Sequence, residues 1–170
     1  DKSLDAYLKE RLLLMGQSVA HRHKVYLDTK YWLLLRDFAM GKLHDESIGR
    51  LSRLLHQGVS EAQLVCPISA STFMEISAQS DPETLRCSAQ LIDTLSCGIS
   101  ALAWDERLRL ELLYFLHRYT HGEDSCHSPH LLVWTKLVYT LGFTAPCNTP
   151  FQPHEELVMQ KAFLDHMWSV

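Results

Sequence analysis

Apolar residues recur along the chain in two patterns, which predict alternating helices and short strands. Steps of three and four between large apolar residues are typical of helices. Such spacing occurs in 3–16, 30–42, 46–58, 69–80, 82–96, 106–120, 130–141 and 154–168. Short apolar runs, typical of buried strands, occur at 25–27, 63–69 and 99–104. The alternation predicts an α/β fold: a three-layer α/β/α sandwich with a central, mainly parallel sheet.

Residues at the ends of these segments support the helical interpretation. Small polar residues that cap helix starts, and prolines in first turns, precede several segments, and glycines follow them. The expected starts are Ser3, Asp81 before Pro82, Asp105, and Ser128 before Pro129; the expected stops are Gly16, Gly41, Gly98 and Gly142.

Length and composition predict one ordinary globular domain. The 170 residues suit a single domain over 1–170, with 1–22 as an N-terminal helical extension and 23–170 as the core. Hydrophobic residues make up 46% and charged residues 21%, which excludes a disordered or collagen-like chain. A net charge of -4 argues against binding nucleic acid by bulk electrostatics alone.

Cysteine usage and hydropathy predict a cytoplasmic protein that does not enter membranes. The five cysteines are scattered and contain no C-x-x-C pair, a pattern typical of reduced thiols. No apolar stretch approaches the roughly 20 residues that span a bilayer.

Three acidic residues stand among apolar or small neighbours. Asp28 ends the run Val25–Leu27, Glu75 lies early on the helix after the second predicted strand, and Asp165 lies within "KAFLDHMW". Carboxylates gathered together repel one another unless a cation joins them, and Mg²⁺ or Mn²⁺ is the cation that suits oxygen ligands. We therefore predict a catalytic metal site at Asp28, Glu75 and Asp165.

Two of these acids lie in motifs that resemble a known family. "VYLDTKYW", followed 47 residues after Asp28 by Glu75 in "CPISASTFMEI", resembles the PIN-domain nucleases. The resemblance extends over 25–76. It implies a PIN-like α/β/α fold that cuts RNA, most readily single-stranded RNA, with Mg²⁺ or Mn²⁺. Asp28 and Glu75 would be metal ligands, and Thr29 would orient the site.

The resemblance also implies features of the later part of the chain. The family has another acid on a later helix, for which Asp165 is the first candidate and Asp124 the second. It has a further strand ending in an aspartate, for which this sequence has no counterpart. We therefore expect one of three cases: the core is incomplete at its C-terminal end, the missing strand comes from elsewhere, or the late part of the fold has diverged. Small nucleases of this type are often held silent by a partner, which implies a protein partner or inhibitor.

Two alternatives to a nuclease stay open. The first is a catalytically inactive PIN-like module that works by binding a protein and exposes an apolar patch. The second is a zinc-stabilised domain, because histidines and cysteine crowd into "HRYTHGEDSCHSPH". Its candidate ligands are His117, His121, Asp124, Cys126, His127 and His130.

Overall fold

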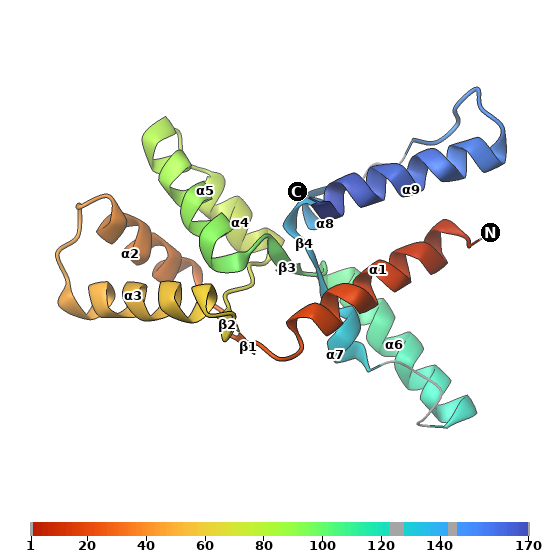
Figure 1. Cartoon of the computed structure of the whole chain (residues 1–170), viewed down its shortest axis with the longest axis horizontal. Helices are drawn as coiled ribbons and strands as arrows, with labels where there is room; N and C mark the ends of the chain where they lie inside the picture. The colour runs from red at the N-terminus through yellow and green to blue at the C-terminus, as the bar shows by residue number, and fades with distance from the viewer. Residues whose placement is uncertain (1, 123–127, 143–145, 170) are drawn as a thin grey trace. The chain divides into compact units, whose positions relative to one another are not determined.

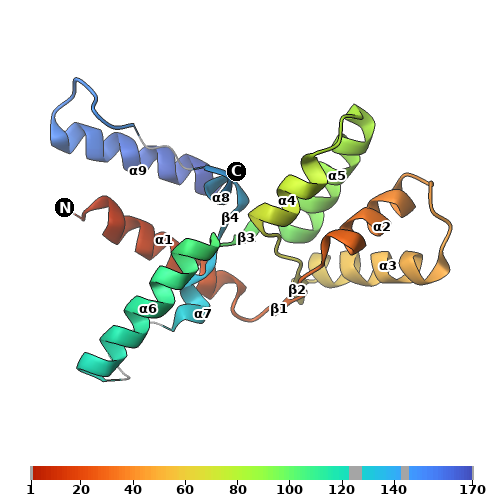
Figure 2. The same cartoon turned by 180° about the vertical axis from the view of Figure 1, so that it is seen from behind.

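A computed structural model describes residues 2–122, 128–142 and 146–169. The chain divides into two compact units. Unit 1 comprises Asp1–Ala20 together with Ala101–Val170, and unit 2 comprises His21–Ser100. Figures 1 and 2 show the elements of each unit, and the units are described separately below. The expectation of a single domain with a helical extension stays a prediction.

Helices dominate the described residues, and the predicted three-layer PIN-like sandwich is wrong. The structure is 69% helical, and its strands form two sheets of only two strands each, so the described residues contain no central sheet covered by helices. The strands are β1 (His23–Lys24), β2 (Leu64–Val65), β3 (Ile99–Ala101) and β4 (Trp134–Lys136).

The strand-like runs are too short and too interrupted to build that sheet. Val25 donates its N–H to the carbonyl of Val65, but the ladder stops there, and Tyr26 is 60% exposed. Pro67 has no N–H to continue β2. Three apolar residues in a row were therefore a weak signal of a central strand.

Unit 2 consists of four capped helices around a short parallel pair of strands. The helices are α2 (Thr29–Ala39), α3 (Glu46–Ser60), α4 (Ala70–Ser77) and α5 (Pro82–Ser96), and their N-caps are Asp28, Asp45, Ser69 and Asp81. β1 pairs parallel with β2 in the register His23↔Leu64 and Lys24↔Val65. The core comprises Trp32, Leu35, Leu55, Val65, Ile68, Ile76, Ile92 and Leu95.

Unit 1 is helical apart from β4. Its helices are α1 (Leu4–Val19), α6 (Trp104–His121), α7 (Pro129–Leu132), α8 (Leu137–Gly142) and α9 (Pro153–Ser169). The core cluster comprises Leu12, Leu102, Leu132, Tyr139 and Leu164. No helix among the described residues is long and apolar enough to cross a bilayer.

Three local expectations for unit 1 differ from the structure. Gly16 does not stop α1, which continues to Val19; a Cβ on Gly16 would lie 1.9 Å from the carbonyl oxygen of Leu131, so its lack of a side chain lets α7 approach. Asp105 does not cap α6, because the helix already begins at Trp104 and its N-cap is Ala103. The segment 130–141 is divided between α7, β4 and α8, because β4 takes part in strand pairing that helical spacing cannot reveal.

Candidate metal centre

Asp28 lies where the chain leaves the short parallel pair of unit 2 and enters α2. Its backbone is extended, and its Oδ1 accepts a hydrogen bond of 2.9 Å from the N–H of Thr29. The prediction that Asp28 ends a strand over 25–27 is wrong, because β1 ends at Lys24; Asp28 is instead the N-cap of α2. The side chain is exposed, so its carboxylate is accessible to an ion from solvent.

Glu75 lies on α4. Thr29 contacts both Glu75 and Asp28 and so links the two residues. The hydroxyl of Thr29 donates a hydrogen bond of 2.6 Å to Oε2 of Glu75, across 46 positions of sequence. Thr29 thus contacts one carboxylate through its backbone and the other through its side chain. The structure brings together the three residues Asp28, Thr29 and Glu75 predicted from the two motifs.

The two carboxylates are not paired with a protein cation in the part of the chain that the structure describes. Within the described ranges, neither Asp28 nor Glu75 forms an ion pair, and their only hydrogen-bond donors are the neutral groups of Thr29. Neither carboxylate is compensated by a protein cation, and a divalent ion would compensate both. No three His, Cys, Asp or Glu side chains gather as a metal-ligand group in the part of the chain that the structure describes. The set fits Mg²⁺ or Mn²⁺, which is bound through one or two carboxylates with water and phosphate.

A group of hydroxyls lies at the start of the helix that carries Glu75. Tyr26 contacts Ser69 and Thr72, with 3.1 Å between its hydroxyl oxygen and each of theirs. Ser69 caps α4, and Thr72 lies three residues before Glu75 on the same helix. Such groups can donate hydrogen bonds to a phosphate.

Sequence reasoning missed Tyr26, because the whole run 25–27 was interpreted as buried. The signal that could have identified it is the alternation along that run. Leu27 is 5% exposed whereas Tyr26 is 60% exposed, as expected for neighbouring residues in an extended segment.

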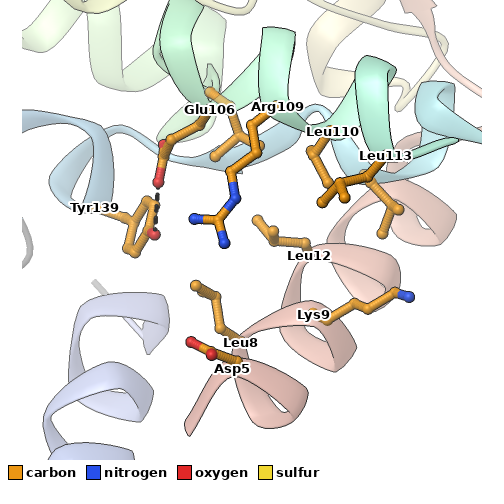
Figure 3. A pocket seen from close by; sticks show the side chains of 11 residues that line it. Asp5, Leu8, Lys9, Leu12, Glu106, Arg109, Leu110, Leu113 and Tyr139 are labelled. Atoms are coloured by element: carbon orange, nitrogen blue, oxygen red, sulfur yellow. Dashed lines mark hydrogen bonds between the residues drawn. The ribbon is translucent and has the colours of Figure 1, made fainter. Parts of the chain in front are cut away.

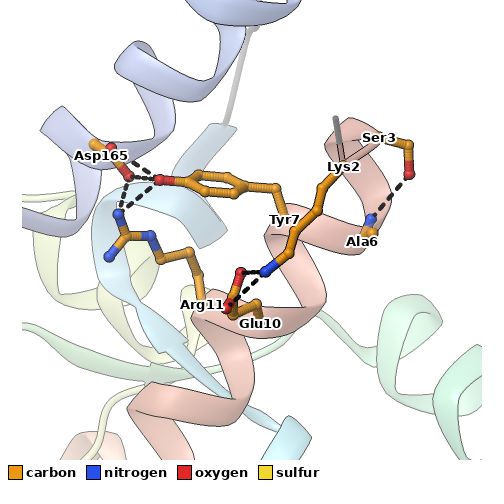
Figure 4. Close-up of polar contacts among 7 residues, drawn as sticks. All are labelled: Lys2, Ser3, Ala6, Tyr7, Glu10, Arg11 and Asp165. Carbon is orange, nitrogen blue, oxygen red and sulfur yellow. Dashed lines mark hydrogen bonds and ion pairs between the residues drawn. The ribbon is translucent and has the colours of Figure 1, made fainter.

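Asp165, the third predicted ligand, lies on α9 in unit 1 and already has a counter-ion. Its carboxylate forms an ion pair with Arg11 and accepts hydrogen bonds of 2.8 and 2.9 Å from the hydroxyl of Tyr7, as Figure 4 shows. Tyr7 also accepts a hydrogen bond from Arg11, which is the largest cause of the raised pKa of Arg11; the charge of Asp165 raises that pKa further. Its assignment as a metal ligand stays a prediction.

The alternative sites fall partly outside the described residues. Asp124, Cys126 and His127 are not described, so the zinc hypothesis and the second candidate for the third acid stay predictions. Of the other residues in that set, His117 and His121 lie one turn apart on α6, with 2.8 Å between their Nδ1 atoms. His130 is exposed on α7.

Unit 1 also contains a cavity of about 240 Å³ between α1 and α6 (Figure 3). Tyr139 donates a hydrogen bond of 3.1 Å to Glu106 at its edge, and burial raises the pKa of Tyr139. Its walls are formed by Leu8, Leu12, Leu102, Leu110, Leu113 and Leu132, and its charged groups are those of Asp5, Lys9, Glu106 and Arg109. The cavity contains none of the predicted metal ligands.

Comparison with known proteins gives no match at any level. No protein-family model, no curated protein and no solved structure matches the chain.

Proposed function

We propose that unit 2 binds Mg²⁺ or Mn²⁺ through Asp28 and Glu75 and hydrolyses phosphodiester bonds of RNA. The observation that carries the proposal is the contact of Thr29 with both carboxylates, which form no ion pair among the described residues. RNA as the substrate is supported by the resemblance of 25–76 to the PIN-domain nucleases. A cytoplasmic location belongs to the same proposal and is supported by free thiols at Cys66, Cys87, Cys97 and Cys147.

Each residue of the centre has a distinct part in this proposal. A bound divalent ion supplies electrostatic stabilisation of the phosphoryl group and acidifies water. Asp28 presents a carboxylate whose direction is fixed by its cap to α2, and Glu75 presents one that is oriented by Thr29. Tyr26, whose side chain is exposed, supplies a hydroxyl for the phosphate oxygens, and Thr72 holds that hydroxyl in place. The reaction needs no protein nucleophile.

The proposal is tested by titrating Mn²⁺ calorimetrically and by measuring cleavage of a fluorescent single-stranded RNA in the same samples. Asp28→Asn keeps a good N-cap but removes the charge, so we expect Mn²⁺ affinity to fall at least about tenfold and cleavage to be lost. Glu75→Gln should behave in the same way.

Asp45→Asn is the matched control. Asp45 caps α3 by accepting hydrogen bonds from the N–H groups of Ser47 and Ile48, and it makes no contact with Glu75. We expect this variant to bind Mn²⁺ and cleave RNA like the wild type. A wild type that binds no Mn²⁺, or a wild type and Asp28→Asn that cleave equally, would refute the proposal.

A further inference from the structure

Most of the large apolar side chains of helix α6 in unit 1 are exposed to solvent. None of the 18 residues of Trp104–His121 is buried. Tyr119 is 84% exposed, Trp104 71% and Phe115 65%. Leu108, Leu112 and Leu116 are each about half exposed, at 57%, 55% and 49%. Contiguous exposed apolar patches of this kind mark interaction sites.

Five of these six side chains lie on one face of the helix. Positions 104, 108, 112, 115 and 119 fall within about 80° of arc at 3.6 residues per turn. The other face is turned toward α1, because Glu106, Arg109, Leu110 and Leu113 line the cavity between α1 and α6 (Figure 3). The stripe formed by Trp104, Leu108, Leu112, Phe115 and Tyr119, called the α6 stripe below, therefore faces away from α1.

The spacing within the α6 stripe is that of a helix-pairing seam. Leu108, Leu112, Phe115 and Tyr119 follow one another in steps of four, three and four, which is the alternation of the two apolar positions of a heptad repeat. Two helices with this seam pack their apolar residues in layers. In an antiparallel pair of identical helices, Leu112 lies opposite Phe115, and Leu108 lies opposite Tyr119.

The charges beside the α6 stripe are complementary in the same arrangement. Glu111 and Arg118 lie two turns apart on one flank of the stripe, and an antiparallel two-fold pair brings Glu111 of each copy against Arg118 of the other. Arg118 also takes part in an interaction within its own chain, and its guanidinium has five N–H donors with which to serve both. A parallel pair would not join these two residues.

The area of the α6 stripe is sufficient for such an interface. Large aromatic side chains bury about 150–250 Å² each, so the stripes of two copies together cover on the order of 1,000 Å². We propose that the chain forms a two-fold symmetric dimer through antiparallel pairing of α6. The proposal does not depend on the metal centre of unit 2.

Sedimentation equilibrium of the full chain over a wide concentration range tests the proposal. We expect a dimer for the wild type. Leu112→Lys places a charge in the centre of the seam in both copies, so the dissociation constant should rise at least about 100-fold. Leu14→Lys is the control, because Leu14 is also about half exposed, at 52%, but lies on α1. It should leave the dissociation constant unchanged.

A charge exchange tests the antiparallel orientation. Glu111→Arg should weaken the dimer about tenfold by opposing like charges at two places, and the double variant Glu111→Arg with Arg118→Glu should restore it. Circular dichroism confirms that each variant is folded. The proposal is overturned if the wild type is monomeric throughout, if Leu14→Lys and Leu112→Lys weaken the dimer equally, or if the double variant is no tighter than Glu111→Arg.

Discussion

Asp28 in unit 2 and Asp165 in unit 1 look alike in the sequence but have opposite surroundings. Both stand among apolar neighbours. Asp28 accepts a hydrogen bond from a neutral amide and has no ion pair among the described residues, whereas Asp165 is paired with Arg11 and bonded to Tyr7. The comparison teaches that apolar neighbours in the sequence do not tell whether a carboxylate has a protein cation beside it.

Removing both charges of the unit 2 centre should have the largest effect. The double variant Asp28→Asn with Glu75→Gln leaves no carboxylate, so we expect Mn²⁺ affinity to fall about 100-fold or more. Asp165→Asn should change it less than about twofold, because Arg11 already compensates that charge. Calorimetric titration measures both. A loss in Asp165→Asn as large as that in the double variant would remove the distinction between the two acids.

Removing the hydroxyl of Thr29 should have the next largest effect on Mn²⁺ affinity. Thr29→Val keeps the shape of the side chain but removes the donor to Glu75, so that carboxylate loses its orientation. Loss of a group that orients a metal ligand costs about tenfold in affinity. Thr29→Ser keeps the hydroxyl and should stay close to the wild type in the same titration. Equal affinity in the valine and serine variants would mean that Thr29 does not hold the centre.

Breaking the ion pair of Asp165 should reduce stability rather than metal binding. Arg11→Met removes the counter-ion of Asp165. Both side chains of this ion pair are partly exposed, so we expect the free energy of unfolding to fall by only about 1 kcal/mol. Urea unfolding measures it. Lys2→Met breaks the more exposed pair of Lys2 with Glu10, where the side chain of Lys2 is 61% exposed, and should cost less. Equal stability of Arg11→Met and the wild type would contradict this account.

The smallest expected effect concerns Asp81, whose carboxylate caps α5. Hydrogen bonds from the hydroxyl and the N–H of Thr84 hold the pKa of Asp81 below its usual value. A carboxyl whose pKa is lower in the folded state stabilises the fold above its unfolded pKa, and this stabilisation is lost as the pH falls through the folded pKa. In Asp81→Asn, the free energy of unfolding, measured by urea unfolding at a series of pH values, should therefore fall less steeply as the pH is lowered than in the wild type. An equally steep fall in both proteins would contradict this account.

The helices of unit 2 could be predicted because their signals are local. Asp81 before Pro82 marks the start of α5, and the predicted range 82–96 is confirmed. The sandwich was wrong because a strand depends on partners that a run of three apolar residues cannot specify. The same limit applies to 130–141, where β4 interrupts a helical spacing.

The two candidate sites differ in predictability for the same reason. The contact of Asp28 with the N–H of Thr29 follows from a helix cap, which is a local feature. The contact of Thr29 with Glu75 spans 46 positions, and only the resemblance of the two motifs indicated it. The ion pair of Arg11 with Asp165 joins positions 154 apart, and no spacing in the sequence indicates it. The exposure of the α6 stripe was equally hidden, because helical spacing alone does not say which face is covered.

The division of the chain into units has a consequence for synthesis. Unit 1 is made of two segments, and the 80 residues His21–Ser100 of unit 2 separate them. During translation, unit 2 is complete while α1 still lacks α7, whose approach Gly16 permits. Because synthesis runs from the N-terminus, α1 stays uncovered by α7 until all the residues of unit 2 have been made.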